Sequence, residues 1–385
     1  MGGNQNMKNI LIFYASYGGG HLNAAKSIHE YISNHYENNS IELIDCMKYV
    51  NKAVEKLTTA TYREAAKKAP WVWGKIYSNS QTGPLAHLST RSNKIMAIKL
   101  LKLLREKKPD LIISTHPFSS QMCSYLKRKG KITAKIATIM TDFAPHDQWL
   151  VGSDFTDYFF VANDKMKDYL VQKNIADKKV FVTGIPLSSR FLQKYDRKEI
   201  LDNYHLKEGK QNILFFGGGE FGLGKNRTFD IFNSLIKSSK DRQIIAIAGK
   251  NEKMKTKFDE IVKTNHASGR VRVLSFTNQI PELMSISDLV VTKPGGMTTT
   301  ESLASKLPMI IINPIPGQEE ENAEFLESKG VGIWIKKDDN ISKILNHLFS
   351  NPNTLNEMKN QTTLLGNPNS TKDICEILFN TKKST

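Results

Sequence analysis

Short apolar runs alternate with amphipathic segments along most of this 385-residue chain. Runs typical of β-strands lie at residues 9–14, 41–44, 110–114, 135–139, 158–161 and 180–182, and then at 213–216, 243–248, 271–274, 288–291, 308–312 and 331–335. Segments with helical periodicity lie at 21–36, 93–107, 118–129, 225–239, 251–265, 280–286, 340–350 and 370–379. Strands that alternate with helices form parallel sheets, so the pattern predicts an α/β protein.

Two of the strands run into glycine triplets, and each triplet precedes an expected helix. The first triplet is residues 18–20 and the second is residues 217–219. Two such starts predict two separate parallel sheets, joined by the polar segment 187–208, which suits a hinge. Neither triplet has the G-x-G-x-x-G spacing, and the chain has no G-x-x-x-x-G-K-[ST] run. A nicotinamide or flavin site and a P-loop nucleotidase are therefore not indicated.

The segment 290–322 carries the most informative polar pattern, and it is expected to form a strand, a glycine turn, a helix, a second strand, a turn and a second helix. Its Pro-Gly-Gly turn at 294–296 leads into a helix that Thr298 is expected to open. The first N–H groups of a helix have no partner within it and can hold a phosphate. Glu301, expected in the first turn, is placed to bond a ribose diol beside that phosphate. The alternative is an ordinary β-α-β unit in which Glu301 only favours the helix dipole.

Other polar side chains also follow the carboxyl ends of predicted strands. Strand 308–312 is followed by amide and carboxylate groups that suit the hydroxyls of a sugar: Gln318, Glu319 and Asn322. Further side chains follow other strands: His21, His116, Asp142 and Phe276. Ligands of open α/β sheets bind outside the carboxyl ends of the strands, so we expect these residues at one cleft between two domains.

The net charge of +16 is unevenly distributed. Residues 48–110, one sixth of the chain, contain fourteen Lys and Arg against four Asp and Glu. Such a surplus favours anionic partners, namely nucleic acid, acidic lipid or phosphates. Trp71 and Trp73 lie among these lysines, and aromatic residues beside lysines suit a membrane interface. The alternative is a solvated helical face with a few buried aromatic residues.

The sequence has no signal for a membrane span or for secretion. It contains no run of about 18 apolar residues, and the first residues include no apolar signal core. The three cysteines, Cys46, Cys123 and Cys375, are far apart and match neither a metal site nor a disulfide framework. This cysteine usage fits a reducing cytosol.

Seven short runs then occur together in a characteristic order. They are GGGHLNAAKSI at 18–28, THPFSS at 115–120, TDFAPHDQW at 141–149, VTGIP at 182–186, FGGGEFG at 216–222, TKPGGMTTTESLA at 292–304 and NPIPGQEEENAEFL at 313–326. With them the chain resembles the monogalactosyldiacylglycerol synthases and the bacterial processive diacylglycerol glucosyltransferases of glycosyltransferase family 28. A more distant resemblance is to the N-acetylglucosaminyltransferase that makes lipid II. The resemblance covers nearly the whole chain.

This resemblance implies the GT-B fold, in which two Rossmann-like parallel-sheet domains face each other across a cleft. The N-terminal acceptor- and membrane-binding domain would span residues 7–190, and a C-terminal helix within 365–385 would pack back on it. The UDP-sugar-binding domain would span residues 191–364. The region 48–110 would correspond to the variable acceptor and membrane segment of the family.

The resemblance also assigns contacts with the UDP-sugar. Glycine backbone and the turn at 294–298 would hold the diphosphate, Glu301 the ribose, and backbone groups of Phe276 and Thr277 the uracil, while residues from 318 on would face the hexose. The implied donor-binding residues are Gly217, Gly218, Gly219, Phe276, Thr277, Pro294, Gly295, Gly296, Met297, Thr298, Glu301, Gln318, Glu319 and Asn322.

The acceptor side follows from the same resemblance. Gly19, Gly20 and His21 would lie where the sugar meets the acceptor hydroxyl, and His116 and His146 would serve that side. A UDP-sugar is α-linked, so attack from the opposite face gives a β-glycoside and needs one base. His21 is the favoured base because an imidazole titrates near neutral pH. Asp142 is the rival base, or the residue that orients His21.

No metal is expected in the site. No Asp-x-Asp metal pair is evident near the cleft, and helix N–H groups can stabilise the leaving phosphate. The UDP-sugar is a co-substrate, and no cofactor is expected.

The leading prediction is an inverting transferase that moves a hexose, with glucose favoured, from a UDP-sugar to diacylglycerol. The enzyme would be cytoplasmic and peripheral on the inner face of the cell membrane, with anionic lipids and no nucleic acid as partners. The number of sugars added and the oligomeric state are left open. The alternatives are transfer of N-acetylglucosamine to a polyprenyl lipid, a UDP-sugar 2-epimerase, and a non-catalytic UDP-sugar sensor. The epimerase leaves the basic segment with Trp71 and Trp73 unexplained.

Overall fold

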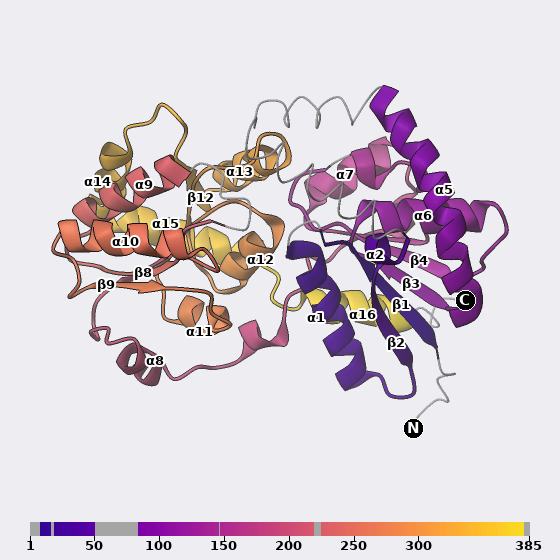
Figure 1. Ribbon diagram of the computed structural model, residues 1–385, viewed down its shortest axis with the longest axis horizontal. Helices are drawn as coiled ribbons and strands as arrows, with labels where there is room; N and C mark the ends of the chain where they lie inside the picture. Colours follow the sequence, from indigo (N-terminus) through magenta and orange to yellow (C-terminus); the bar gives the residue numbers. More distant parts are fainter. Residues whose placement is uncertain (1–7, 17–18, 51–83, 146, 219–224, 381–385) are drawn as a thin grey trace. The chain divides into compact units, whose positions relative to one another are not determined.

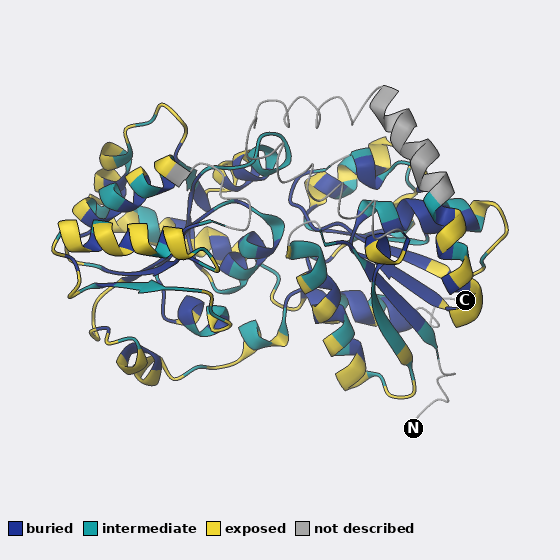
Figure 2. Ribbon diagram, viewed as in Figure 1, coloured by how far each residue is buried: buried dark blue, intermediate teal, exposed yellow. Residues whose placement is uncertain are grey.

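The computed structural model of the protein describes residues 8–16, 19–50, 84–145, 147–218 and 225–380, with the backbone alone for 84–95, 225 and 380. The chain forms two compact units (Figure 1). Unit 1 is Met1–Ser189 with Asn367–Thr385, and unit 2 is Arg190–Gly366. Each unit contains one parallel sheet of six strands. The strands are mostly buried, and the outer faces of the helices are exposed (Figure 2).

The sheet of unit 1 is built from apolar runs that are buried on both faces, as expected for parallel strands. Its strand order is β2-β1-β3-β4-β5-β6. The strands are β1 (Asn9–Tyr14), β2 (Ser40–Asp45), β3 (Leu111–Ser114), β4 (Lys135–Ile139), β5 (Tyr158–Val161) and β6 (Val180–Val182). Leu11 and Phe13 of β1 enter one hydrophobic cluster, whereas Ile10 and Ile12 enter the cluster on the opposite face. This alternation is the two-residue period of a strand.

Helices cover both faces of this sheet. They are α1 (Gly20–His35), α2 (Cys46–Val50), α5 (Pro84–Lys107), α6 (Pro117–Arg128), α7 (Asp164–Gln172) and α16 (Ser370–Asn380), with the short 3₁₀ helices η1 (Asp147–Trp149) and η2 (Asp177–Lys179). The C-terminal helix α16 belongs to unit 1, because Ile374 and Leu378 pack in one cluster with Ile28 of α1. Hydrogen bonds fix its start: Ser370 Oγ donates to Ile185 O at 2.7 Å, and Leu187 N donates to Thr371 Oγ1 at 2.8 Å.

The sheet of unit 2 has the strand order β12-β11-β10-β7-β8-β9. Its strands are β7 (Asn212–Phe216), β8 (Gln243–Ile247), β9 (Val271–Leu274), β10 (Leu289–Thr292), β11 (Met309–Ile311) and β12 (Gly332–Trp334). Its helices are η3 (Ser189–Leu192, which begins at the last residue of unit 1), α8 (Arg197–Asn203), α9 (Lys225–Ser238), α10 (Glu252–Thr264), α11 (Ile280–Ser285), α12 (Gly296–Ala304), α13 (Gln318–Ser328), α14 (Ile341–Ser350) and α15 (Pro352–Leu365).

Each sheet has one point at which the chain reverses its direction of growth. In unit 1, β1 has β2 on one side and β3 on the other, so the loops after β1 and β3 diverge. In unit 2 the same happens between β7 and β10. Ligands of open α/β sheets bind at such a switch point, outside the carboxyl ends of the strands. The topology therefore directs attention to four loops, those that follow β1, β3, β7 and β10.

The predicted α/β class and all of the predicted strands are confirmed. Two helices were not predicted, α7 and α15. Each buries only two side chains, four residues apart: Met166 and Leu170 in α7, and Met358 and Thr362 in α15. Two buried positions are too few to show a helical repeat of apolar residues in the sequence. Helix α5 also begins at Pro84, before the predicted start at 93, and the segment 187–208 contains only short helices.

Candidate active site

His21 occupies the switch point of unit 1, as the second residue of α1. Its Nδ1 atom lies 2.6 Å from Thr115 O and 3.1 Å from Thr141 Oγ1. A backbone carbonyl can only accept, so Nδ1 carries the hydrogen and donates it to Thr115 O. In the neutral ring, this tautomer leaves Nε2 as the atom with the available lone pair. The local geometry therefore prepares Nε2 to accept a proton.

The protonation state of His21 follows from its surroundings. Burial lowers the pKa of His21 to about 4, although the hydrogen bond to Thr115 works in the opposite direction. The imidazole is thus neutral at neutral pH, the form that a general base needs. Thr115 also supports the loop, because its Oγ1 donates to His21 O at 2.9 Å.

His116 and Asp142 lie at the ends of the neighbouring strands. His116 is the N-cap of α6, where its Nδ1 accepts from Phe118 N at 3.2 Å, and its ring meets that of His21 edge to face at 4.6 Å. Asp142 is 7% exposed and directly follows Thr141. The loops after β1, β3 and β4, which are adjacent strands, thus bring His21, His116 and Asp142 to one edge of the sheet.

The hydrogen bonds of His21 Nδ1 involve two residues that the sequence pattern did not single out, Thr115 and Thr141. Both stand next to a predicted site residue at a strand end, which is the only signal that could have found them. The role of Asp142, as the rival base or as the residue that orients His21, stays a prediction.

The predicted acceptor-side glycines, Gly19 and Gly20, lie at the start of α1. Gly19 is the N-cap of α1 with φ −79°, and a Cβ atom there would meet nothing within 4 Å. Gly20 is the first residue of the helix. Several predicted residues lie outside the described residues: His146, Gly219, Trp71 and Trp73.

In unit 2 the glycine loop after β7 is tightly packed. A Cβ atom on Gly217 would lie 2.6 Å from the Phe258 ring and 2.7 Å from Met254 Sδ. Gly218 has φ +122°, a conformation that side chains rarely adopt. Gly217 is therefore required by close packing against α10, and Gly218 by its backbone conformation.

The loop after β10 leads into α12, which begins at Gly296 with Gly295 as its N-cap and no side-chain capping bond. The prediction that Thr298 opens the helix and Glu301 lies in its first turn is wrong, because the two glycines let the helix begin earlier. Glu301 is in the second turn. Since the helix dipole acts mainly on the first turn, the alternative in which Glu301 only favours the dipole loses its support.

The Glu301 side chain is half-buried. The loss of water around its carboxyl raises the pKa of that group to about 8. Without a ligand this group is therefore mostly protonated at neutral pH. Met297 is nearly buried and Thr298 is partly exposed at the same helix end.

Helix α13 joins this site from the loop after β11. Gln318 is its first residue, and Glu319 Oε2 accepts from Ile315 N at 2.6 Å. Asn322 is fully buried, and its Nδ2 donates to Pro294 O at 3.0 Å. Asn322 thus ties α13 to the turn before α12, and its predicted contact with a hexose stays a prediction.

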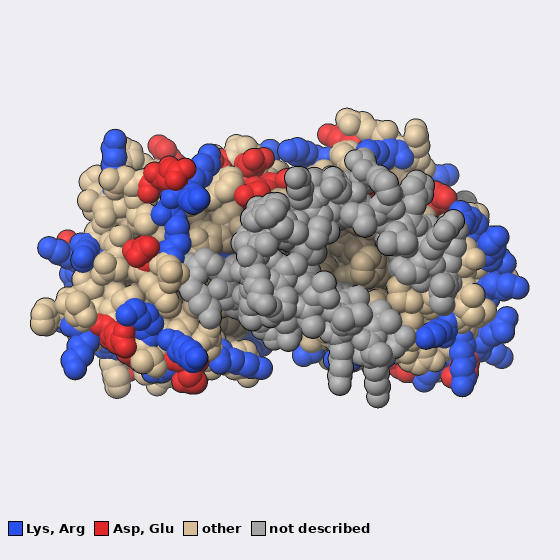
Figure 3. All heavy atoms as spheres, turned by 45° about the horizontal axis from the view of Figure 1, so that its top comes forward, with Lys and Arg blue, Asp and Glu red and all other residues tan. Residues whose placement is uncertain are grey.

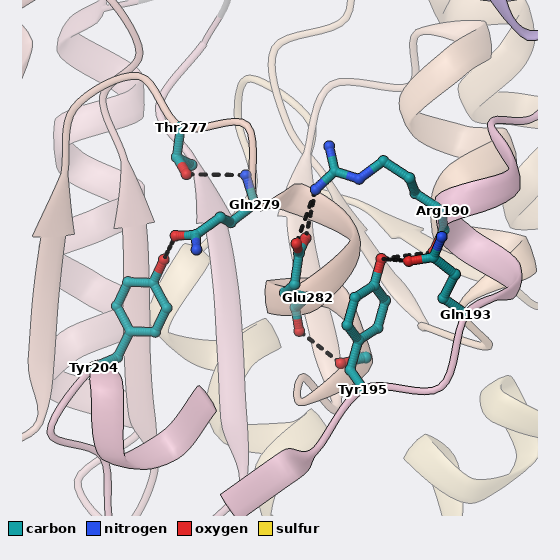
Figure 4. A network of polar contacts seen from close by, with 8 residues as sticks. Arg190, Gln193, Tyr195, Tyr204, Thr277, Gln279 and Glu282 are labelled. Atoms are coloured by element: carbon teal, nitrogen blue, oxygen red, sulfur yellow. Dashed lines mark hydrogen bonds and ion pairs between the residues drawn. The ribbon is translucent and has the colours of Figure 1, made fainter. Parts of the chain in front are cut away.

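The predicted nucleobase residues follow β9. Phe276 is 57% exposed, with Lys250 Nζ 5.0 Å from the centre of its ring. Gln279 N donates to Thr277 Oγ1 at 3.0 Å, and Tyr204 OH donates to Gln279 Oε1 at 2.5 Å (Figure 4). This chain of bonds fixes the turn that carries Phe276 and Thr277.

A neighbouring ion pair holds the helix that follows the turn. Arg190 Nη2 lies 2.8 and 3.1 Å from the two carboxylate oxygens of Glu282 in α11 (Figure 4). Tyr195 OH donates to Arg190 O at 2.8 Å. The start of unit 2 is therefore anchored to α11, directly after the turn with the predicted nucleobase residues.

The described residues contain no cluster of three His, Cys, Asp or Glu side chains that could hold a metal ion. They also contain no helix long and apolar enough to cross a bilayer.

Residues 21–187 match the family model described as monogalactosyldiacylglycerol (MGDG) synthase, and residues 212–376 match the glycosyltransferase family 28 C-terminal domain. Over 375 residues, the chain is 31% identical to a processive diacylglycerol beta-glucosyltransferase of Staphylococcus epidermidis, with 97% of this chain and 92% of that protein covered. It is 29% identical to the enzyme of the same name from Bacillus subtilis, with 96% and 94% covered.

Solved structures share the fold at low sequence identity. MurG of Acinetobacter baumannii matches with a TM-score of 0.66 at 14% identity, covering 97% of this chain and 99% of that one. UDP-GlcNAc 2-epimerase from Neisseria meningitidis, bound to UDP-GlcNAc, matches with a TM-score of 0.64 at 15% identity, covering 97% and 100%. Together with the two parallel sheets, these matches confirm the predicted GT-B fold.

Proposed function

The chain belongs to the family of the monogalactosyldiacylglycerol synthases and the processive diacylglycerol β-glucosyltransferases, and we propose that it transfers glucose from UDP-glucose to diacylglycerol. The similarity to glucosyltransferases over 97% of the chain carries this proposal. The neutral, half-buried imidazole of His21 supports it, because such a transfer needs a base for the acceptor hydroxyl.

In the proposed reaction the diacylglycerol hydroxyl attacks the anomeric carbon of the sugar from the face opposite UDP. The bond from that carbon to the β-phosphate oxygen breaks, and its electron pair leaves with UDP. The hydroxyl proton passes to His21 Nε2. Attack from the opposite face inverts the configuration, so an α-linked UDP-glucose gives a β-glucosyl lipid. The reaction needs no metal or cofactor in this proposal.

The UDP part of the donor is assigned to the switch point of unit 2. The start of α12, which has no side-chain capping bond, supports a phosphate site, since its first N–H groups have no partner within the helix. Glu301 would accept from the ribose hydroxyls, and the turn with Phe276 would hold the uracil. Gln318 and Glu319 would face the hexose.

Two other activities of this fold are less favoured. The matches to MurG and to the 2-epimerase are at 14% and 15% identity and support the fold alone. The relatives at 29–31% identity over nearly the whole chain carry the name of a diacylglycerol glucosyltransferase.

A turnover assay tests the proposal. The purified protein is given diacylglycerol vesicles with UDP-glucose, UDP-galactose or UDP-N-acetylglucosamine in parallel, and lipid products are identified by mass spectrometry. We expect β-glucosyl-diacylglycerol from UDP-glucose. A lipid product from UDP-galactose alone would show that the transferred sugar is galactose. Conversion of UDP-N-acetylglucosamine without a lipid product would show that the protein is an epimerase. The His21→Ala protein is the control for contaminating activity.

We also propose that the enzyme acts as a peripheral protein on the inner face of the cell membrane, bound to anionic lipid. The described part of α5 exposes Ile98, at 64%, beside Lys99, Lys102 and Arg105. On the described surface in Figure 3, basic and acidic side chains are interspersed. Six of the fourteen Lys and Arg of 48–110, together with Trp71 and Trp73, lie outside the described residues.

Vesicle sedimentation tests this attachment. Electrostatic binding should favour acidic over neutral liposomes and weaken with salt, since the Debye length falls from about 10 Å at 0.1 M to about 3 Å at 1 M. A Trp71→Ala/Trp73→Ala protein should bind less at every salt concentration. If the protein binds both liposome types equally and the double variant binds as well as the unmodified protein, the segment 48–110 is only a solvated insertion.

A further inference from the structure

Lys293 stands at the centre of the unit 2 switch point. It is the first residue after β10, the strand next to β7, and it lies three residues before the start of α12. Its side chain is half-buried. Burial lowers the pKa of this ammonium group, while the nearby Glu319 carboxyl raises it. A cation in such a place carries an electrostatic cost that a bound anion would offset.

The sequence segment that contains Lys293 is otherwise acidic. Residues 289–328, which form the loops after β10 and β11 with their helices, contain six Glu, two Lys and no Asp or Arg. The second lysine, Lys306, follows the other end of α12. That helix has 9 residues and so spans about 13 Å. Within this stretch, Lys293 is therefore the cation at the helix end that would face a diphosphate.

The backbone around Lys293 is arranged to suit an anion. Thr292 Oγ1 donates to Lys293 O at 3.2 Å, and Asn322 Nδ2 donates to Pro294 O at 3.0 Å. Side chains thus occupy both carbonyl oxygens, which would otherwise repel a phosphate. Glu319 is held as well, since its Oε2 accepts from Ile315 N at 2.6 Å.

Lys293 itself makes no such bond. Among the described residues, none forms a hydrogen bond with its ammonium group or lies within ion-pair distance of it. Its charge is balanced only at longer range by Glu319. A partly buried ammonium group that keeps its donors available beside an uncapped helix start is suited to a phosphate oxygen.

We infer that Lys293 is the cation that binds the diphosphate of the sugar donor and remains on it as UDP leaves. This inference rests on the proposed function. The sugar–oxygen bond breaks with its electron pair on the β-phosphate, so negative charge grows there while the acceptor proton goes to His21. Lys293 keeps its proton throughout and stabilises the charge that develops, a task that a metal performs in other phosphate sites.

The competing explanation is that Lys293 only balances the Glu319 carboxylate. Calorimetric titration with UDP separates the two, because UDP has the diphosphate and lacks the hexose that Glu319 would face. The variants are Lys293→Met, Glu319→Gln and the charge-balanced pair Lys293→Met/Glu319→Gln. Lys306→Met is the matched control, since it removes the same charge at the other end of α12. Thermal unfolding reports the fold of each variant.

We expect Lys293→Met to weaken UDP binding by about tenfold or more, as for loss of a bond to a charged group. The charge-balanced pair should be more stable to heat than Lys293→Met. It should still bind UDP more weakly than Glu319→Gln does. Uridine, which lacks phosphate, should bind Lys293→Met as it binds the unmodified protein, and Lys306→Met should bind UDP normally.

Full UDP affinity in the charge-balanced pair would overturn the inference and leave Lys293 as a partner of Glu319. That reading holds even if Lys293→Met alone does not fold. Equal losses of uridine and UDP affinity would also overturn it, because the defect would then not concern phosphate. Failure of the unmodified protein to bind UDP would instead overturn the proposed function.

Discussion

The two units use the same sheet edge for different chemistry. In each, a strand ends at a switch point, a glycine loop follows, and a helix begins. Both helices begin after a glycine N-cap without a side-chain capping bond, but unit 1 adds hydroxyl groups and the His21 imidazole there, whereas unit 2 adds Lys293 and Glu301. The first set can take up a proton, and the second can hold phosphate and hydroxyl groups. The difference lies in the few residues that follow the strands and not in the architecture.

Burial shifts the pKa values of His21 and Glu301 in opposite directions. It lowers the pKa of His21 to about 4 and raises the pKa of Glu301 to about 8. In both cases the neutral form is favoured, because removing water disfavours charge. For His21 the neutral form is the active one. For Glu301 the charged form is the better acceptor, so its ligand must act against the effect of burial.

The largest expected effect comes from removing the proton acceptor of unit 1. His21→Ala should lower kcat by roughly 10²–10⁴, the usual share of general acid–base catalysis. Steady-state turnover with diacylglycerol vesicles measures it. His29→Ala, which removes a second imidazole from α1, is the control and should keep normal turnover. Near-normal kcat in His21→Ala would move the base to Asp142 or elsewhere.

The two glycine loops should differ in their tolerance of a methyl group. Gly217→Ala places Cβ against Phe258 and Met254 and should destabilise the fold by about 1–3 kcal/mol. Gly19→Ala meets open space and should leave stability unchanged or raise it by up to about 1 kcal/mol. Denaturant unfolding of both proteins provides the measurement. Equal stability losses would mean that the loops are packed alike.

Glu301 should make binding of the sugar donor depend on pH. Its carboxylate accepts from ribose hydroxyls better than the neutral acid, and with a pKa of about 8 the group ionises as pH rises through that value. UDP-glucose affinity should therefore increase by about tenfold from about pH 7 to about pH 8.5. Calorimetry on the native protein and on Glu301→Gln compares the two. A pH dependence that persists in Glu301→Gln would assign it to another group.

Thr141 should have the smallest effect. Thr141→Val removes the oxygen 3.1 Å from His21 Nδ1 but leaves Thr115 O, a backbone group that no substitution removes. We expect a loss in kcat/KM of about two- to tenfold, as for one neutral hydrogen bond. The pH profile of kcat/KM is the specific readout, because a disturbed imidazole should also move the acid limb. An unchanged profile would make Thr141 a structural residue only.

The sequence predicts most of this fold because parallel strands leave uninterrupted apolar runs, from residues 9–14 to residues 331–335. It misses α7 and α15, since each buries only two side chains. In the candidate site, His21 stands out through its glycine triplet. Thr115 and Thr141 do not, because the hydrogen bonds of His21 depend on three adjacent strands that are far apart in the chain. The earlier start of α12 is also hidden, as glycines are poor helix formers.

The most direct test of the division between the units is titration of UDP into His21→Ala and Glu301→Ala in parallel. The account predicts that His21→Ala binds UDP as the unmodified protein does. Glu301→Ala should lose about 1.5–3 kcal/mol of binding free energy, as for a hydrogen bond to a charged group. Unchanged UDP affinity in a folded Glu301→Ala protein, with a large loss in His21→Ala, would contradict it.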